Sequence, residues 1–294
     1  MTARRRLVRV PATSANLGSG FDVFAAALQL HLELEVAEAD AFEVDVGGDP
    51  LPADRSNLCV RAFERLHAAD GLRFEVRSEI PIARGLGSSA AAIVAGLMAA
   101  DHLYELALDP LELYRHAVEL EGHPDNVAGA LFGAIALCPR SDGGELPAPI
   151  RLEPPEGVEP VLVVPGEEVP TADARAALPS SIEFDAAVGN LAASAQLALG
   201  IERSDLTLIA RGLEDRLHQP ARTSLYPRSM EIVEAASELG AIGASISGAG
   251  PTVLVWCFWQ DTGKVVSGLE ERAEGWAEII RAPFSPIGAD VPEL

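Results

Sequence analysis

The sequence is poor in basic residues, in cysteine and in long apolar runs. Its 294 residues include 22 Lys and Arg against 44 Asp and Glu, a formal net charge of −22. Because nucleic-acid backbones require a basic surface, this balance argues against a nucleic-acid partner and favours a solvated acidic surface. The three cysteines, Cys59, Cys138 and Cys257, are scattered and lack metal-ligand spacing, which is typical of a reducing compartment.

The sequence also lacks a recognisable membrane segment. Its longest apolar stretch, Ala90–Ala100, is too short to span a bilayer. The arginines at positions 4–6 resemble the start of a signal peptide, but Pro11 and polar residues follow where an apolar core would be needed. These features predict a cytoplasmic protein without a membrane partner.

Strand-like and helix-like segments are mixed without a regular alternation, which favours an α+β fold. Residues 7–10 read as a strand that Pro11 terminates, and His31–Ala37 alternates apolar and acidic residues as a half-buried strand does, with Phe42–Val46 as its expected partner. Residues 139–160 are rich in Gly, Pro and acid. We place the boundary between two domains, residues 1–150 and 151–294, in this segment, which can equally be one long surface loop.

The most informative stretch is Pro81–Ala92 (PIARGLGSSAAA), between the strand-like Leu72–Ile80 and the apolar Ala90–Ala100. Gly85 and Gly87 permit a tight turn, and Ser88 or Ser89 is expected to cap the following helix. The unpaired amides of such a helix N-terminus bind anions, above all phosphate. No P-loop lysine follows, so charge neutralisation would come from amides, from Arg84 and from a metal ion. An ordinary capped helix after a glycine turn is the alternative.

This stretch resembles the central motif Pro-x-x-x-Gly-Leu-Gly-Ser-Ser-Ala of the GHMP kinases. Further segments resemble the homoserine kinase branch of that family, and the resemblance runs from residue 8 to about residue 256. Ser19 stands where these kinases usually have proline. The segments are VRVPATSANLGSGFD (8–22), EGHPDN (121–126), TADARAALP (171–179), DRLHQPARTSLY (215–226) and SISGAGPT (245–252).

The resemblance implies a two-domain GHMP kinase fold, with an N-terminal ATP-binding domain like domain 2 of ribosomal protein S5 and a ferredoxin-like C-terminal domain. It implies ATP and Mg²⁺ as cofactors, L-homoserine as the small-molecule substrate and a homodimer. The implied reaction is ATP-dependent phosphorylation of the L-homoserine hydroxyl to O-phospho-L-homoserine, in threonine biosynthesis.

The same resemblance assigns roles to residues. For the substrate, Arg175 and Arg222 would hold the carboxylate, because planar, permanently charged forks suit it, and acceptors would meet the ammonium. Glu121 and Ser88 would bind Mg²⁺, and Asp125, Asn126 and Arg175 would act in catalysis, with no base assigned. The implied substrate-binding set is Asn16, Asp22, His123, Asp125, Arg175 and Arg222. The implied ATP-binding set is Asn57, Pro81, Ile82, Ala83, Arg84, Gly85, Leu86, Gly87, Ser88, Ser89, Ala90, Ala91, Ser247 and Gly248.

Blander interpretations exist for each residue taken alone. Asn16 and Asp22 could be turn residues, His123 structural, and the two arginines ordinary surface charges. A mevalonate-type GHMP kinase is the nearest rival, but its substrate has no amine to place opposite the arginines. A catalytically silent ATP-binding sensor would be favoured by loss of Glu121 or of the glycine loop, and neither is lost. A dinucleotide-binding oxidoreductase lacks its G-x-G-x-x-G signature here.

Overall fold

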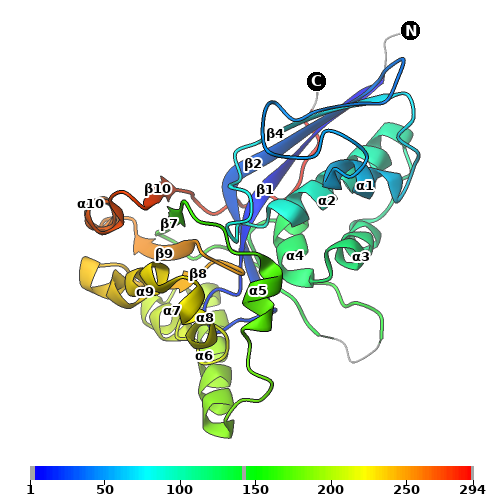
Figure 1. The fold of residues 1–294 in the computed structure, drawn as a ribbon. Coiled ribbons are helices and arrows are strands. Elements are labelled where there is room, and N and C mark those ends of the chain that lie inside the picture. Colours follow the sequence, from blue (N-terminus) through cyan, green and yellow to red (C-terminus); the bar gives the residue numbers. More distant parts are fainter. Residues whose placement is uncertain (1–3, 141–143, 293–294) are drawn as a thin grey trace.

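The computed structural model describes residues 4–140 and 144–292, and it contains two β-sheets. In the first sheet the strand order is β3-β4-β2-β5-β6, with β1 paired to β2. Helices α1 to α4 lie on one side of this sheet (Figure 1). The strands are β1 (Arg5–Ala15), β2 (Phe24–Glu38), β3 (Glu43–Asp45), β4 (Leu72–Ser78), β5 (Ile135–Leu137) and β6 (Ile150–Leu152), and the helices are α1 (Leu58–Glu64), α2 (Ser88–Tyr104), α3 (Pro110–Glu121) and α4 (Pro124–Phe132).

The second sheet has the strand order β10-β7-β9-β8, and its pairs are antiparallel. With helices after β7 and after β9, this order is the ferredoxin-like arrangement expected for the second half of the chain. Its strands are β7 (Val158–Pro165), β8 (Gly243–Ile246), β9 (Val253–Phe258) and β10 (Ala277–Arg281). Its helices are α5 (Thr171–Ala176), α6 (Phe184–Arg203), α7 (Leu206–Gly212), α8 (Gln219–Arg222), α9 (Pro227–Leu239) and α10 (Thr262–Ala273), with a 3₁₀ turn at Thr223–Leu225.

Two strand predictions were wrong. Pro11 does not terminate the first strand, because a register shift between Pro11 and Ala12 lets β1 continue pairing with β2 as far as Ala15. The segment around β3 pairs parallel with β4 and not with the strand at His31–Ala37. The long β1 matters for the site, since it carries the chain directly into the loop at residues 16–22.

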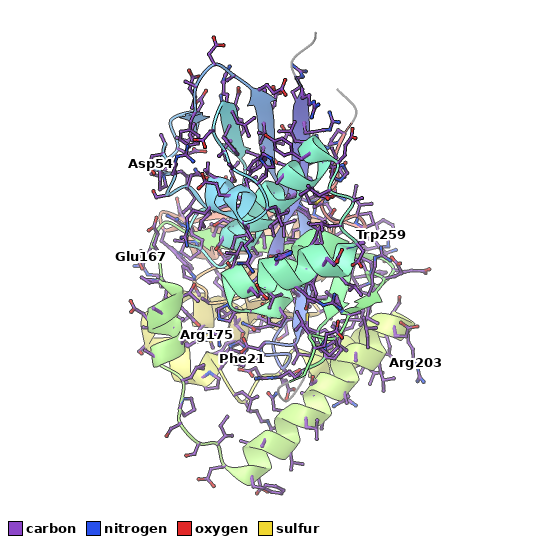
Figure 2. The ribbon with its side chains drawn as sticks, turned by 90° about the vertical axis from the view of Figure 1, so that its right-hand side faces the viewer. Phe21, Asp54, Glu167, Arg175, Arg203 and Trp259 are labelled. Atoms are coloured by element: carbon purple, nitrogen blue, oxygen red, sulfur yellow. The ribbon has the colours of Figure 1, made fainter. Side chains whose placement is uncertain are left out.

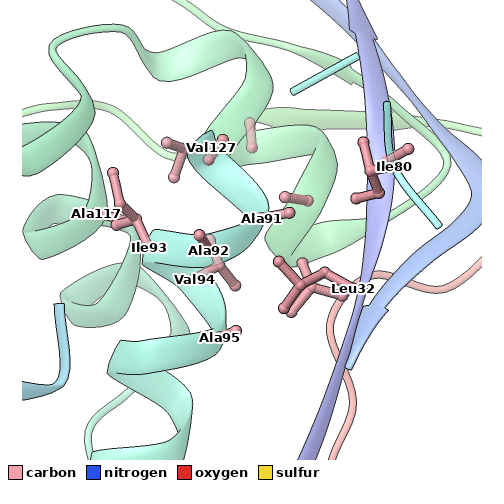
Figure 3. Close-up of a cluster of buried hydrophobic side chains, with 14 of the residues drawn as sticks. Leu32, Ile80, Ala91, Ala92, Ile93, Val94, Ala95, Ala117 and Val127 are labelled. Carbon is pink, nitrogen blue, oxygen red and sulfur yellow. The ribbon is translucent and has the colours of Figure 1, made fainter. Parts of the chain in front are cut away.

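Helix α2 is the centre of the first domain's core. Thirteen of its residues are buried, and they are almost all small or aliphatic. Figure 3 shows five of them, Ala91–Ala95, between Leu32 of β2 and side chains such as Ala117 of α3 and Val127 of α4. Small residues let three neighbouring elements approach closely, so the start of α2 is held rigidly where the glycine loop meets it.

The two halves of the chain are connected at more than one place. Strand β6 pairs with β5 in the first sheet, so it lies across the predicted boundary at residue 150. Residues 283–290 also return to the first sheet, where isolated bridges join Phe284 to Leu28 and Asp290 to Arg9. The domain limits stay a prediction, and the site lies where these two connected halves meet.

One helix, α6, is long and apolar enough by length and composition to cross a membrane. In its most apolar window 28% of the residues are buried inside the protein. Its buried side includes Asn190, Leu197 and Gly200, which pack against the loop at residue 19 and against α7. This side therefore belongs to the folded core.

The contact between α1 and α2 predicts a mutational effect. A Cβ atom at Gly96 of α2 would collide with the backbone of Cys59 and the side chain of Ala62. We expect Gly96→Ala to lower the free energy of unfolding by about 1–3 kcal/mol, measured by urea denaturation. Gly263→Ala in α10 is the matched control, because nothing lies within 4 Å of the added methyl. It should be neutral or stabilising by up to about 1 kcal/mol, and equal destabilisation of both variants would contradict the packing argument.

Candidate active site

A cavity of about 320 Å³ lies where loops from both halves of the chain converge. We call it the acceptor cavity. Its walls come from the loop after β1, the glycine loop and start of α2, the end of α3, the start of α4, α5 and α8. The lining residues are Ala15, Asn16, Phe21, Asp22, Ala83, Gly85, Leu86, Gly87, Ser88, Ser89, Glu121, His123, Asp125, Asn126, Val169, Pro170, Thr171, Arg175, Arg222, Gly248 and Ala249.

The glycine loop leaves the first amides of α2 uncapped. The N-cap is Gly87, at φ 68°, and no side chain caps the helix. The expected cap by Ser88 or Ser89 was therefore wrong, because both serines lie inside the helix and Ser89 Oγ donates to Glu121 Oε2 instead (2.6 Å). A Cβ at Gly87 would collide with Thr13 Oγ1, so only glycine fits there. The free amides and the helix dipole make this end a site for anions.

The loop at residues 247–250 locks the glycine loop to the loop after β1. Ser247 Oγ donates to the Gly85 carbonyl (2.7 Å), and the Gly248 amide donates to the Ala15 carbonyl (3.0 Å). Asn16 Nδ2 donates to the Gly248 carbonyl (2.7 Å), while its Oδ1 accepts from the Asp22 amide (3.1 Å). Three segments that are far apart in the sequence are thus joined by hydrogen bonds, and the loop at residues 247–250 packs against the glycine loop.

Two carboxyl groups of the acceptor cavity, those of Asp125 and Glu121, are desolvated. Burial raises the pKa of Asp125 to about 7, although its Oδ1 accepts a hydrogen bond from the Asn126 amide. Burial also raises the pKa of Glu121, opposed by the hydrogen bond from Ser89. The pKa of His123 is lowered, first by burial and then by the nearby Arg175 cation, which favours the neutral imidazole. Perturbed acid–base groups gathered in one cavity are typical of an active site.

The two arginines differ in their partners. Arg175 of α5 forms a two-pronged ion pair with Asp22, at 2.7 and 3.0 Å, and this hydrogen bonding raises the pKa of Arg175. Arg222 is only 2% exposed and donates to neutral groups, the carbonyl oxygens of Ala174 and Gly248 and Nδ1 of His218. In the part of the chain that the structure describes, no carboxylate pairs with it. Burial accordingly lowers the pKa of Arg222.

A buried cation without a counter-ion is costly unless a ligand supplies the negative charge. Arg222 faces the acceptor cavity. Phe21 provides a shared apolar contact, since the guanidinium carbons of Arg175 and Arg222 lie 5.5 and 5.4 Å from its ring centroid. Figure 2 shows Phe21 and Arg175 close together. The cavity thus offers an unpaired cation beside an internal ion pair.

A second cavity, of about 270 Å³, adjoins the first at Ser88, which lines both. We call it the apolar cavity. Its walls are mostly aliphatic, and Asn57 lies in them with its amide already used, because Oδ1 caps α1 at Cys59 and Nδ2 donates to the Pro52 carbonyl. The lining residues are Leu32, Leu51, Pro52, Ser56, Asn57, Leu58, Cys59, Val76, Ser78, Ile82, Ser88 and Ala92.

Several predicted site residues lie outside the acceptor cavity. Arg84 was expected to help neutralise phosphate, but its guanidinium donates to the carbonyls of Ile82, Pro165 and Gly166 and so ties the glycine loop to the end of β7. Ala90 and Ala91 are fully buried within α2. Neither Pro81 nor Ser247 is among the residues that line it. Among the described residues, no group of three His, Cys, Asp or Glu side chains is placed to hold a metal ion.

Sequence reasoning missed some residues of the site. Thr13 donates through Oγ1 to Asn126 Oδ1 (2.7 Å) and so orients that amide. Phe21 and His218 support the two arginines, although both fall inside segments whose motifs were recognised. The helices α4, α5 and α8 were also missed, because they are short and their apolar periodicity is weak. The available indication of these three helices was that they overlap the motifs EGHPDN, TADARAALP and DRLHQPARTSLY.

Comparison with known proteins agrees with this geometry. A family model described as the GHMP kinases N-terminal domain matches residues 57–134, and one described as GHMP kinases C-terminal matches residues 197–275. A homoserine kinase of Thermus thermophilus is 44% identical over 251 residues, covering 83% of this chain and 84% of its own. One of Moorella thermoacetica is 40% identical over 259 residues, covering 85% and 87%. The chain belongs to the homoserine kinases of the GHMP kinase family.

A solved structure supports the same family at the level of the whole fold. The crystal structure of homoserine kinase from Cytophaga hutchinsonii superposes with a TM-score of 0.88, at 29% identity, covering 99% of this chain and 98% of that one. The predicted two-domain GHMP kinase fold is therefore confirmed. At the position where homoserine kinases usually have proline, Ser19 here donates through Oγ to the Gly212 carbonyl (2.6 Å), which ties the loop after β1 to α7.

The desolvation of Asp125 predicts a pH effect on stability. Its folded-state pKa of about 7 lies above the ordinary value of 3.8, so the folded protein binds more protons than the unfolded chain between these values. Its contribution to stability is present at acidic pH and is lost as the pH rises through 7. Between pH 5.5 and 8.5, the native protein should lose about 2 kcal/mol of unfolding free energy relative to Asp125→Asn. Urea denaturation at both pH values measures this. Asp40→Asn, at an exposed position, should follow the native profile. Parallel profiles for Asp125→Asn would contradict the burial argument.

Proposed function

We propose that this chain transfers the γ-phosphoryl group of MgATP to the hydroxyl of L-homoserine, giving O-phospho-L-homoserine and ADP. One observation carries the choice of substrate class. The acceptor cavity places an unpaired buried cation, Arg222, beside the carboxylate of Asp22. An amino acid bears one group for each, a carboxylate for Arg222 and an ammonium for Asp22. Its side-chain hydroxyl can then point toward the phosphate end of the site.

The unliganded pocket satisfies its own charges through the Arg175–Asp22 pair. A zwitterionic substrate would compete for both partners at once, since its ammonium suits Asp22 and its carboxylate suits Arg175 together with Arg222. A substrate with only one of these charges would leave an opposite charge uncompensated. This explains how the pocket would select zwitterions over simple hydroxy acids or amino alcohols.

For ATP, the two adjoining cavities suggest a division of the molecule. The aliphatic walls of the apolar cavity suit a purine base, and the amides at Gly85–Ser89 suit the phosphates. Ser88, which lines both cavities, marks the passage between them. Asn57 would contribute through the wall that it shapes by capping α1.

The donor set fits Mg²⁺. Glu121 is a largely buried carboxylate beside Ser88 and Ser89, and Mg²⁺ prefers one or two carboxylates completed by phosphate oxygens and waters. Bound there, the ion would neutralise charge on the transferring phosphoryl group. The rest of the chemistry is positioning: Thr13 orients Asn126, Asp22 orients Arg175, and the buried Asp125, whose pKa lies near 7, can exchange a proton near neutral pH.

The cavity also weighs against the two rival functions considered from the sequence. A mevalonate-type kinase would act on a hydroxy acid without an amine, for which Asp22 has no partner. A silent ATP-binding sensor would keep the apolar cavity and glycine loop but not need Asp125 or Asn126 in the acceptor cavity. The charges at Arg222 and Asp22 favour the homoserine kinase over both.

The proposal predicts a pattern of acceptor use. In an ADP-release assay with MgATP we expect turnover with L-homoserine and little with 3-amino-1-propanol, which lacks the carboxylate, or with 4-hydroxybutanoate, which lacks the ammonium. Mevalonate and shikimate should be inert. Arg222→Ala should lower kcat/KM for L-homoserine by about 100-fold or more, since it removes a buried charge pair, and should erase the preference over 3-amino-1-propanol.

Arg211→Ala, which removes an exposed arginine of α7, is the matched control and should behave as the native protein. Turnover of mevalonate would favour the first rival. Retained ATP binding without turnover of any acceptor would favour the sensor.

We also propose that the protein acts in the cytoplasm, in threonine biosynthesis, as a homodimer. The surface that supports a dimer is the outer face of α6, whose first turns project from the molecule (Figure 1). Phe184 is 79% and Leu191 72% exposed there, with Val188 and Leu199 on the same side. Residues 186–201 carry no charged side chain. In a chain of net charge −22, two such faces could meet without bringing acidic side chains together.

The dimer predicts a mass near twice 30.9 kDa by light scattering. Leu191→Lys should shift this mass to that of the single chain, because it buries a charge in the apolar contact. Ile150→Lys, at another exposed apolar residue, should leave the mass unchanged. A native protein that is monomeric, or a Leu191→Lys protein that stays dimeric, would rule out this interface.

A further inference from the structure

His218 is a fully buried histidine behind the acceptor cavity, and the proposed chemistry gives it no role. It lies at the N-cap of the short helix α8, one turn before Arg222. Its Nε2 lies 2.9 Å from the Gly18 carbonyl, and its Nδ1 lies 3.3 Å from Nη1 of Arg222. The ring also packs on Phe21, with centroids 5.0 Å apart. The imidazole therefore contacts both the loop after β1, at Gly18, and Arg222.

The partners fix which nitrogen carries the proton. A carbonyl oxygen only accepts, so Nε2 must be protonated to bond Gly18. A guanidinium only donates, so Nδ1 must be unprotonated to receive the hydrogen bond from Arg222. His218 is thus the neutral Nε2–H tautomer. Burial, which lowers its pKa, favours the same neutral form.

Asp215 completes the support without taking the proton. Its carboxylate accepts the backbone amides of Leu217, His218 and Gln219, which fixes the start of α8. Its Oδ2 lies 3.6 Å from His218 Nε2, farther than the Gly18 carbonyl. The backbone of α8 is therefore anchored by Asp215, and the side chain of His218 is left to bridge the loop after β1 and Arg222.

Arg222 needs such an acceptor because its own surroundings are neutral. Its guanidinium has five N–H groups in a fixed plane, and its orientation decides whether the remaining donors meet a carboxylate in two-pronged fashion. The Ala174 carbonyl accepts from Nε at 2.8 Å, and among the described residues Nη1 donates to His218 Nδ1 at 3.3 Å and to the more distant Gly248 carbonyl at 3.4 Å. An uncharged acceptor at Nδ1 orients the fork without cancelling its charge, which an Asp or Glu at this place would do.

We infer that His218 is a positioning residue that sets acceptor specificity: as a neutral hydrogen-bond acceptor it aims the Arg222 fork at the substrate carboxylate and couples that fork to the Gly18 loop. This inference rests on the proposed function, in which Arg222 binds the carboxylate. It adds that recognition of the carboxylate depends on a side chain that never touches the substrate.

Two substitutions separate the two hydrogen bonds of the ring. In His218→Asn, Oδ1 takes the place of Nδ1, so the acceptor for Arg222 is kept and the bond to Gly18 is lost. In His218→Gln, Nε2 takes the place of the ring Nε2, so the bond to Gly18 is kept and the acceptor is lost. We expect His218→Gln to raise the KM for L-homoserine about tenfold, with kcat and the KM for ATP close to native values. His218→Asn should stay within about threefold of the native KM, since it keeps the bond that matters for the carboxylate.

The decisive measurement is the preference for L-homoserine over 3-amino-1-propanol, which lacks the carboxylate. This preference should fall about tenfold in His218→Gln and persist in His218→Asn. A merely structural role would lower kcat/KM for both acceptors equally and leave the preference intact, which would overturn the inference. A native enzyme without any preference would refute the Arg222 clamp itself, and absence of turnover would refute the proposed function.

A measurement on the native protein guards against variants that do not fold. The ¹⁵N chemical shifts of the His218 ring report its tautomer directly. The inference requires a protonated Nε2 and an unprotonated Nδ1. Because the ring is fully buried, this neutral form should persist across pH 6–8. A protonated Nδ1 or a charged ring would overturn it.

Discussion

The architecture of the site depends on keeping one buried positive charge available. Arg222 donates to neutral acceptors, the carbonyl oxygens of Ala174 and Gly248 and Nδ1 of His218. Desolvating a guanidinium without a counter-ion is unfavourable, so the surrounding fold must be stable enough to hold it. The interlocked loops provide that stability. Hydrogen bonds of 2.7–3.0 Å from Asn16, Ser247 and Gly248 join three segments: the loop after β1, the loop at residues 247–250 and the glycine loop.

At the glycine loop the site depends on a different feature, the uncapped N-terminus of α2. Gly87 begins α2 with a left-handed backbone and no side-chain hydrogen bond, while the nearby serines are directed to Glu121 and to the cavity walls. The first amides of α2 therefore stay free to bind an anion, which is phosphate under the proposed function. The whole sequence contains a single lysine, Lys264 of α10, so under the proposed function backbone amides, arginines and a bound metal ion would have to neutralise the phosphates. The rigid core of small residues around α2 keeps those amides in place.

The sequence predicted the site residues whose type is fixed by their chemical role, but it did not predict contacts that depend on how distant segments pack. The glycine loop, Glu121, Asp125, Arg175 and Arg222 could be located from motifs, and they do line one cavity. The ion pair between Arg175 and Asp22 could not be foreseen, because it joins residues 153 positions apart across two halves of the chain. The wrong prediction that Ser88 or Ser89 caps α2 has the same origin. Cap preferences are local, whereas the hydroxyl of Ser89 donates a hydrogen bond to Glu121 of a neighbouring helix. The role of His218 could not be predicted from its motif either, because it depends on contacts with Gly18, which is distant in the sequence, and with Arg222.

The return of residues 283–290 to the first sheet also has a consequence for how the chain is made. Arg9, near the start of the chain, is bridged to Asp290, and Leu28 to Phe284. During synthesis strands β1 and β2 emerge first, yet these bridges can form only after residues 283–290 have left the ribosome. Until the second half of the chain has been translated, the first sheet therefore lacks the backbone partners of Arg9 in β1 and Leu28 in β2. Such late, distant contacts slow folding and prolong exposure of unpaired strand edges, which gives chaperones a period in which to act.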